Sequence, residues 1–568
     1  MASVHDLVPT LPTFDTATHV VRMDQEPIRQ RSRLFNSCAE RNSLPFIFRL
    51  PTEILEIIFI HRARDYHSKA SCDSTPTVPS WVNISYVCRR WRNVTLNCAT
   101  LWTYLFVTSP RWTEELLARS GNAPLKLHVN PDPCRCDTTF LELGIVEQVM
   151  NRVERIQELC LHLPFTSDDH HFFSKLSSRA PCLQKLKIST EGDFDCSQWS
   201  SVLFDGDTPA LRTLELTGCS VPWYSFTLGG LTTLSLNNVP VPFQQDTVEF
   251  LATLGRMQNL EHLYLNNSLA SAAGFLSSMA LHTFQEVNLP HLSRLLIAAP
   301  LSTVIPLLSR INIPLKTEVR LECHFERDFS LDDYTPLSSL LAQRFSIFRD
   351  QALSSPTIRS LGIQSAEWEK ATLTFSASER DLGSSISISH VEWCRNIPLQ
   401  IVLHFRPSMT RSDGNRIISD ICCAMPLTNV QSVHVLLPPS CSAFWKHALG
   451  HLRGLRHLKL SRGNMPDLAS VLSLAPRDCT KKQDGYMDCG LDRVFAPALE
   501  ELELYDILLS TSPPDDQQSL SDALSTRKEF RGRVTMTQCA VVAGDGRHTM
   551  LDMVGRWESG HFHVIEST

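Results

Sequence analysis

The sequence predicts an α/β protein in which a small helical N-terminal unit precedes an irregular solenoid, a curved parallel sheet with helices or loops outside it. Two observations predict this fold. Apolar residues recur at helical spacing between residues 50 and 95, and beyond residue 155 a short apolar string recurs many times. The composition fits a folded chain, because 43% of the 568 residues are hydrophobic and only 20% are charged.

Composition also argues against several classes of protein. With 60 acidic against 53 basic residues and a net charge of -7, binding to nucleic acid has little electrostatic support. The 18 cysteines show no framework spacing, so we expect reduced thiols. Residues 1–18 resemble no secretory signal, and the apolar stretch Leu295–Ser309 is shorter than the ~20 residues that a bilayer requires. We therefore expect no membrane contact and a cytoplasmic or nuclear location.

The first predicted helix of the N-terminal unit begins at Pro51. Residues 1–43 mix charges and prolines, which predicts a loosely ordered lead-in with one helix over Ile28–Glu40. Pro51 suits the first position of a helix, and Glu53 suits its positive N-terminal end. Apolar residues then recur at the spacing of an amphipathic helix: Ile54, Leu55, Ile58 and Phe59.

A second helical face follows the polar stretch His61–Ser80. It consists of residues at intervals of 3, 4, 3 and 4, which predict one helix: Trp81, Ile84, Cys88, Trp91 and Thr95. Leu101 and Trp102 then lead into a short strand over Tyr104–Val107.

The repeated string has apolar residues at positions i, i+3 and i+5. It starts at ten places: Ile156, Leu183, Leu211, Leu231, Leu260, Leu292, Ile358, Val430, Leu455 and Leu499. The first five starts lie 27, 28, 20 and 29 residues apart, which is typical of leucine-rich repeats. The number of repeats in the gaps 298–357 and 364–429 stays open, although alternating pairs there are typical of strands: Leu373 and Phe375, Ile386 and Ile388, Ile401 and Leu403.

Such a repeat is stable only within an array, because one short strand cannot bury its own leucines. Stacking places each leucine row against the next, and the alternation turns the residues at i+2, i+4 and i+6 to the inner face of the sheet. That face is polar and mixed in sign. Its candidate residues for binding a protein substrate are Glu215, His262, Tyr264, Lys459, Glu503 and Tyr505.

The segment from Leu50 to Trp102 resembles an F-box. The resemblance rests on the run Leu50–Phe59, on Val87-Cys88-Arg89-Arg90-Trp91-Arg92 and on Leu101-Trp102, and the leucine-rich array behind it fits F-box proteins with C-terminal repeats. It implies a substrate receptor of an SCF-type cullin-RING ubiquitin ligase, which docks on a Skp-type adaptor and through it on a cullin, while the repeats capture a target protein. The residues implied in adaptor binding are Leu50, Pro51, Ile54, Leu55, Ile58, Phe59, Val87, Cys88 and Trp91.

A physical argument supports a docking surface independently of the family. A helical unit of roughly 50 residues encloses too little volume to bury all of these apolar side chains. Those that stay exposed form a patch of the kind that marks an interaction site. An alternative is a repeat scaffold that never joins a ligase, in which the N-terminal helices only cap the exposed edge of the first repeat.

The sequence contains no recognisable catalytic or metal-binding motif. It lacks phosphate-binding loops, nucleophile elbows and zinc-protease motifs, so we expect a protein that is not an enzyme and needs no cofactor, although a hydrolase with an unrecognised fold stays a third alternative. The pairs Cys134-Cys136 and Cys422-Cys423 are too tightly spaced for zinc. The expected organisation is lead-in 1–43, F-box-like domain 44–107, connector and cap 108–155, repeat domain 156–545 and tail 546–568.

Overall fold

The computed structural model forms two compact units, residues 1–101 and 102–568, each considered by itself. The structure describes residues 46–69, 80–106, 110–129, 148–164, 175–191, 202–219, 226–239, 247–268, 286–314, 316–325, 334–346, 358–364, 372–381, 399–404, 411–436, 442–464, 472, 495–510, 516–525, 532–542, 548–558 and 561–566. The predicted helix Ile28–Glu40 and the pair Ile386 and Ile388 lie outside the described residues.

The first unit is helical. Its elements are η2 (Phe46–Arg49), α2 (Thr52–Lys69), η3 (Ser80–Tyr86), α3 (Arg89–Asn97) and η4 (Ala99–Trp102). Helix α2 begins at Thr52, one residue after the predicted start at Pro51, and extends into the polar stretch His61–Ser80. One face of α2 is buried through Leu55, Phe59 and Ala63, and the ring of Phe59 packs against that of Trp91 with centroids 5.0 Å apart.

The prediction of one continuous helix through Trp81 and Thr95 is wrong. Cys88 has an extended backbone, with φ -158° and ψ 170°, and therefore separates η3 from α3. Its Sγ accepts a hydrogen bond from the backbone N–H of Trp91 at 3.4 Å. The spacing of apolar residues does not reveal this break. An N-cap residue can occupy a position in the apolar pattern while its side chain binds one of the free N–H groups at the start of the helix.

The second unit contains one sheet that joins 18 strands within the described residues. Its strands are β1 (Tyr104–Phe106), β2 (Leu125–Val129), β3 (Ile156–Pro164), β4 (Lys185–Glu191), β5 (Thr213–Thr217), β6 (Thr233–Asn237), β7 (His262–Asn266), β9 (Arg294–Pro300), β11 (Glu318–His324), β12 (Ser360–Gln364), β13 (Thr372–Ser378), β14 (Leu399–His404), β15 (Ser432–Leu436), β16 (His457–Asn464), β17 (Glu501–Ser510), β18 (Arg533–Val542), β19 (His548–Glu558) and β20 (His561–Glu566). A separate small sheet pairs β8 (Val287–Asn288) with β10 (Ile311–Asn312).

Strand order follows the chain except in the middle of the sheet. Strands β1 to β7, β9 and β11 pair in parallel with their predecessors. The next neighbour of β11 is β14, followed by the antiparallel β13 and then by β12, which pairs in parallel with β15. Strands β15 to β18 are again parallel, and β19 and β20 add antiparallel. The chain thus reverses its order over β12–β14.

Every one of the ten repeated strings contains a strand, and most of these strands begin at position i+2 of the string. The sequence pattern did not predict strands β2, β11 and β18, because each lacks the first apolar residue of the string. Their alternating apolar residues are present, but the position three residues before the first of them is Asn122, Lys316 or Arg531 instead of an apolar residue. Strands β19 and β20 lie within residues 546–568, which the sequence reading assigned to a tail.

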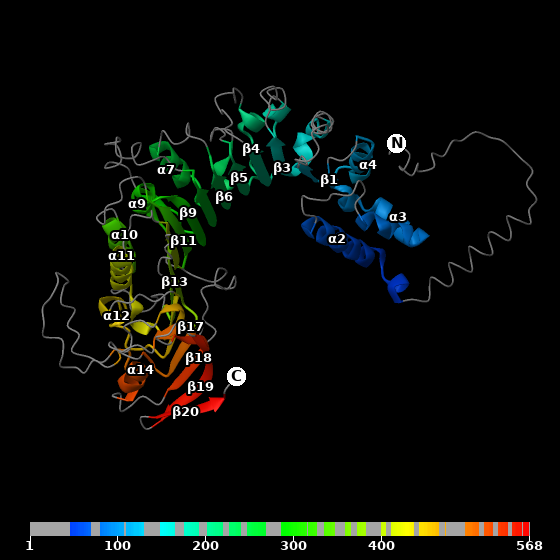
Figure 1. Ribbon diagram of the computed structural model, residues 1–568. Coiled ribbons are helices and arrows are strands. Elements are labelled where there is room, and N and C mark those ends of the chain that lie inside the picture. Colours follow the sequence, from blue (N-terminus) through cyan, green and yellow to red (C-terminus); the bar gives the residue numbers. More distant parts are fainter. Residues whose placement is uncertain are drawn as a thin grey trace, which may run out of the picture. The chain divides into compact units, whose positions relative to one another are not determined.

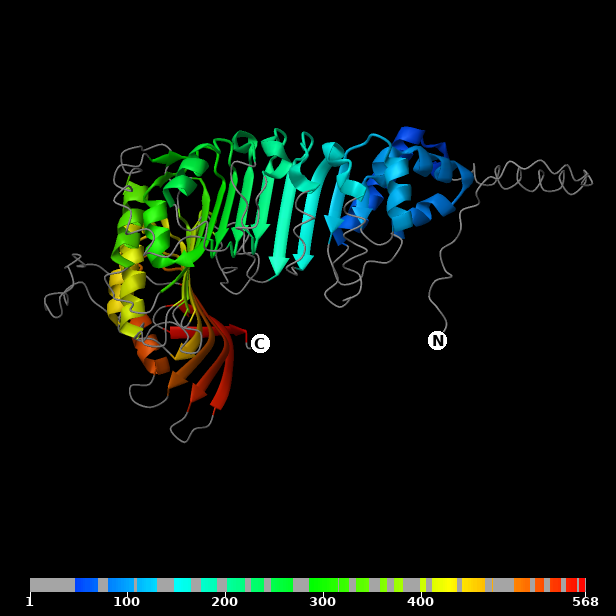
Figure 2. The same ribbon diagram turned by 90° about the horizontal axis from the view of Figure 1, so that it is seen from above.

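Helices lie along one side of the strands in the second unit (Figures 1 and 2). They are α4 (Pro110–Ser120), α7 (Thr247–Gly255), α9 (Leu301–Leu308), α10 (Thr335–Ser346), α11 (Arg411–Ala424), α12 (Ser442–Leu449) and α14 (Asp516–Ser525), with short turns η5 (Val153–Arg155), η6 (Lys175–Ser177), η8 (Leu203–Gly206), η10 (Leu228–Gly230) and η16 (Leu427–Asn429). No helix within the described residues is long and apolar enough to cross a bilayer.

The core of this unit contains a continuous row of buried leucines, one from each of strands β3 to β7 and β9: Leu159, Leu186, Leu214, Leu234, Leu263 and Leu295. Strand register places each directly beside the next. Each buried leucine contributes roughly 1.5–3 kcal/mol relative to exposure, so the row stabilises the array only while its neighbours stay stacked.

The turns after β5, β6 and β7 share one backbone conformation. Gly218, Asn238 and Asn267 follow these strands with φ of 68°, 48° and 47°. Each donates its N–H to a carbonyl of the next strand, at 2.7 to 2.9 Å. Glycine adopts positive φ without strain, and asparagine tolerates it better than most residues. At Gly218 space is also limited, because an added Cβ would lie 2.6 Å from the carbonyl oxygen of Thr190.

We predict that Gly218→Ala destabilises the protein by about 2 to 4 kcal/mol, because the methyl group adds a clash with backbone to the strain of positive φ. Gly121→Ala is the matched control. Gly121 also has positive φ, but nothing lies within 4 Å of its Cβ position, so we expect a loss of only about 1 kcal/mol. Urea unfolding followed by circular dichroism measures both. Equal losses would contradict the role assigned to Thr190.

Candidate functional site: protein interaction surfaces

The strands of the second unit carry a polar face, which we define by the side chains that alternate with the buried leucine row. All six predicted substrate-binding residues belong to it. Register aligns them in rows across neighbouring strands. One row runs through Lys187, Glu215, Ser235, Tyr264, Leu296 and Arg320. The structure thus places on one face residues that lie far apart in the sequence.

Ion pairs between neighbouring strands occupy much of this face. Glu215 lies between two ammonium groups, with Lys185 Nζ at 2.8 Å and Lys187 Nζ at 3.5 Å. Although partial burial opposes the effect, these two lysines lower the pKa of Glu215. Glu215 is therefore ionised at neutral pH and already paired within the protein.

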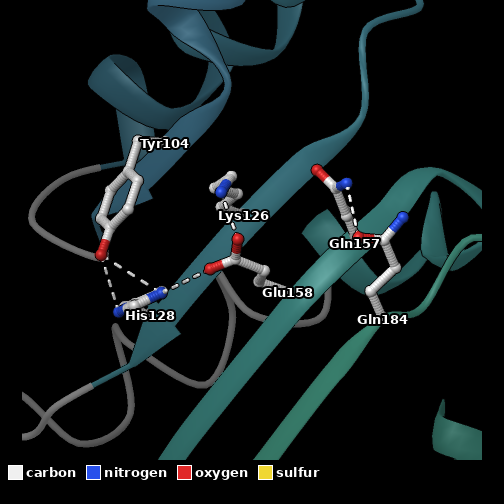
Figure 3. A network of polar contacts seen from close by, with 6 residues as sticks. All are labelled: Tyr104, Lys126, His128, Gln157, Glu158 and Gln184. Atoms are coloured by element: carbon white, nitrogen blue, oxygen red, sulfur yellow. Dashed lines mark hydrogen bonds and ion pairs between the residues drawn. The ribbon is translucent and has the colours of Figure 1, made fainter. Parts of the chain in front are cut away.

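The strands nearest the start of the sheet hold a connected polar network, shown in Figure 3. Tyr104 on β1 shares a hydrogen bond with Nδ1 of His128 on β2 at 2.9 Å. His128 in turn lies 4.0 Å from the carboxylate of Glu158 on β3, which also pairs with Lys126. Interaction with His128, followed by that with Lys126, lowers the pKa of Glu158 to about 2, whereas burial raises the pKa of Tyr104. The carboxylate of Glu158 is therefore ionised at neutral pH and is oriented by His128 and Lys126.

The later strands carry the other three predicted residues. Lys459 on β16 pairs with Glu503 on β17 at 2.7 Å and lies over the ring of Tyr505, 5.8 Å from its centroid. His434 on β15 is buried, and burial lowers its pKa to about 3, so its imidazole is neutral. Its Nε2 lies 2.8 Å from the hydroxyl of Ser461. Tyr505 is thus held by a cation that is itself paired.

The described residues offer no group of three or more His, Cys, Asp or Glu side chains placed to hold a metal ion. Cys422 is buried while its neighbour Cys423 is exposed, and Cys134 and Cys136 lie outside the described residues. On the polar face, burial raises the pKa of the Cys160 thiol to about 11, so this thiol stays protonated at neutral pH.

A second surface lies on the first unit, where helix α2 is apolar on two faces. Leu55 and Phe59 are 0% and 1% exposed and belong to the core of the unit. Ile54, Ile57 and Ile58 lie on the opposite side of the helix with 42%, 50% and 40% of their surfaces exposed. Large apolar side chains that are exposed together normally mark an interaction site, so the three isoleucines form a face that is suited to cover by a partner.

The start of α2 is held by contacts from α3. The guanidinium of Arg90 donates a hydrogen bond to the backbone carbonyl of Leu50, directly before Pro51. Thr95 Oγ1 donates to the carbonyl of Trp91 at 2.8 Å, within the helix whose Trp91 ring packs on Phe59. These contacts fix the orientation of α2, and with it the direction in which the three isoleucines point.

Comparison with families of known proteins supplies the identity of this unit. A model described as F-box-like matches residues 47–108. The chain carries an F-box-like domain. This confirms the resemblance drawn from the sequence, and the long, largely parallel sheet behind the domain is consistent with leucine-rich repeats. No catalytic domain is matched, and a search among curated proteins finds no significant match.

The structure places the predicted adaptor-binding residues of the F-box-like domain at different depths. Pro51, Ile54, Ile58 and Val87 are exposed, whereas Leu50, Cys88 and Trp91 are partly buried. Leu55 and Phe59 are buried in the domain core and support α2 from behind. Ile57 is the most exposed of the helix isoleucines, and the sequence reading omitted it.

We predict that Glu158→Gln lowers the free energy of unfolding by about 1 to 2 kcal/mol at pH 7 and by much less at pH 3. The folded-state pKa lies below the ordinary value of a glutamate, so the charge contributes stability above pH 4.5 that is lost as pH falls towards 2. Urea unfolding at both pH values measures this difference. The control is Glu261→Gln, at an exposed residue without an ion pair in the described part of the chain. A loss independent of pH would refute the charge argument.

Proposed function

We propose that this protein is the substrate-recognition subunit of an SCF-type ubiquitin ligase, acting in the cytoplasm or nucleus. Its F-box-like domain docks on a Skp-type adaptor and thereby on a cullin, and the polar face of its sheet holds the target protein. Catalysis then belongs to partner subunits, and this chain supplies proximity. The observation that carries the proposal is the exposed isoleucine face of α2 inside a segment that matches the F-box-like model.

The isoleucine face can supply a useful part of the docking energy. Full burial of one isoleucine is worth roughly 1.5–3 kcal/mol, and these side chains are already about half covered, so each has about 1 kcal/mol left to gain. Three such gains do not make a tight complex alone, because association itself costs several kcal/mol. Pro51 and Val87 are also exposed on this domain and would extend the contact. The rest of the energy would come from the polar rim, as in other interfaces.

The polar face suits the capture of a protein rather than a small molecule. It extends across many strands, mixes charges of both signs and carries tyrosine side chains, among them Tyr264 and Tyr505, of the type enriched in interface hot spots. Many of its charges are held by neighbours and so are already oriented before a partner arrives. Pre-organised side chains lose less entropy on binding.

We predict that Ile54→Glu combined with Ile57→Glu weakens binding to a purified Skp-type adaptor by at least about tenfold, because each change removes apolar contact and places an unpaired charge in the interface. Biolayer interferometry with the full-length chain measures the affinity. The domain should keep its fold, because both positions are exposed. Unchanged circular dichroism in the variant checks this point.

The matched control is Val202→Glu. Val202 is an apolar residue of the second unit with 41% exposure, so the substitution introduces the same charge at a similar depth outside the F-box-like segment. We expect its adaptor affinity to equal that of the wild type. Adaptor binding that survives the double substitution at Ile54 and Ile57 would refute the docking surface.

A further inference from the structure

Arg320 differs from the other cations of the sheet, because no carboxylate of the described residues lies within 4.0 Å of its guanidinium. Its Nε is buried and finds no hydrogen-bond acceptor there. Every other lysine or arginine described in strands β2 to β17 has a carboxylate partner within that distance: Lys126, Lys185, Lys187, Arg294, Lys459 and Arg462. Arg320 therefore has hydrogen-bonding capacity that no described residue uses.

The two carboxylates on its own strand are engaged elsewhere. Glu318 and Glu322 flank Arg320 on β11 and belong to the same face, since they lie two residues away in either direction. Glu318 accepts Arg294 Nε at 3.3 Å, and Glu322 lies 3.0 Å from Nε2 of His404 on β14. Each glutamate thus points to a neighbouring strand, and the guanidinium between them is left without an anion.

Apolar and aromatic side chains lie beside Arg320 in the same register row. Leu296 on β9 is its direct neighbour, and Tyr264 on β7 is the direct neighbour of Leu296. Because adjacent strands are ~4.8 Å apart, the three side chains span about 10 Å. The ring of Tyr264 stacks on that of His262, with centroids 6.3 Å apart and an interplanar angle of 18°. This stack orients the tyrosine before any ligand binds.

We propose that Tyr264, Leu296 and Arg320 form the anchor subsite for the target protein, and that the subsite takes an acidic side chain next to an apolar one. The inference rests on the proposed function and names the chemistry of the target. The guanidinium pairs with the carboxylate through two parallel N–H groups, a geometry that lysine cannot offer. The neighbouring apolar side chain packs on Leu296 and the tyrosine ring.

The charges around the subsite favour a single carboxylate over a polyanion. Glu318 and Glu322 lie on either side of Arg320, and Glu215 lies farther along the same row. A nucleic acid would bring several phosphates against these carboxylates, whereas one acidic side chain meets only the guanidinium. An acidic and apolar peptide segment is therefore the occupant that fits.

The test uses an array of synthetic 12-residue peptides with randomised flanks and a central pair that is Leu-Glu, Leu-Gln or Leu-Lys. The purified full-length chain is applied as wild type, Arg320→Gln and Arg320→Glu. We expect the wild type to favour Leu-Glu peptides, Arg320→Gln to lose that preference by about tenfold or more, and Arg320→Glu to favour Leu-Lys peptides. The control Arg456→Gln removes an arginine already paired with Glu500 at 3.7 Å and should keep the wild-type preference.

Two results would overturn the subsite: a wild type without preference for Leu-Glu, or an Arg320→Gln variant that keeps it. Adaptor affinity is measured on the same preparations. An intact adaptor interaction without a Leu-Glu preference refutes the subsite alone. A Leu-Glu preference without adaptor binding supports the subsite and refutes the ligase assignment alone.

Discussion

The stacking of leucine rows between neighbouring strands is the interaction on which the rest of the second unit depends. A strand of five residues buries two leucines on one face, as β5 and β6 do, and neither would be covered without the next strand. Register then aligns the alternate side chains as well, so the polar face is a direct consequence of burying the leucines. On β5 and β6 the residues of that face are partly exposed, so they are less constrained by the core than the leucines are.

The reversal over β12–β14 shows that core burial constrains the pattern of side chains more strongly than the order of strands. Strand β13 runs antiparallel between β12 and β14, yet Leu373 and Phe375 face Leu403 and Ile401 and are buried like the leucines of parallel strands. Pairing direction changes the hydrogen-bond pattern but keeps the alternation of two faces. The row of buried apolar side chains therefore continues through the reversal.

The F-box-like domain has no array of strands to complete its core, and it is too small to bury all of its apolar residues. Helix α2 uses Leu55 and Phe59 to form the core of the domain and leaves Ile54, Ile57 and Ile58 exposed. The guanidinium of Arg90 and the N-cap at Cys88 hold the two helices in place, so that surface is presented in one orientation. A rigid apolar face of this kind loses little entropy on association.

The polar face combines fixed ion pairs with Arg320, a cation that has no carboxylate partner among the described residues. Glu158 and Glu215 are held by lysines on neighbouring strands, which keeps them ionised and oriented. Arg320 lies between glutamates that pair with other residues. A charged group that lacks an ion pair within the protein gains more binding energy from a partner's charge than a group that is already paired.

Apolar spacing in the sequence by itself determined the helical unit, the strands at the ten repeated strings and strands β1, β13 and β14, because it records which side chains must be buried. The F-box-like character came from the resemblance of the segment Leu50–Trp102 to a known family. The sequence identified Ile54 and Ile58 for the docking surface but could not separate them from Leu55 and Phe59, since periodicity cannot say which of two apolar faces the domain covers. Only the tertiary structure decided that, together with the break at Cys88, the reversed order of β12–β14 and the isolation of Arg320. These features depend on which strand lies beside which, and a carboxylate 82 residues away, such as that of Glu322 beside His404, leaves no local signal in the chain.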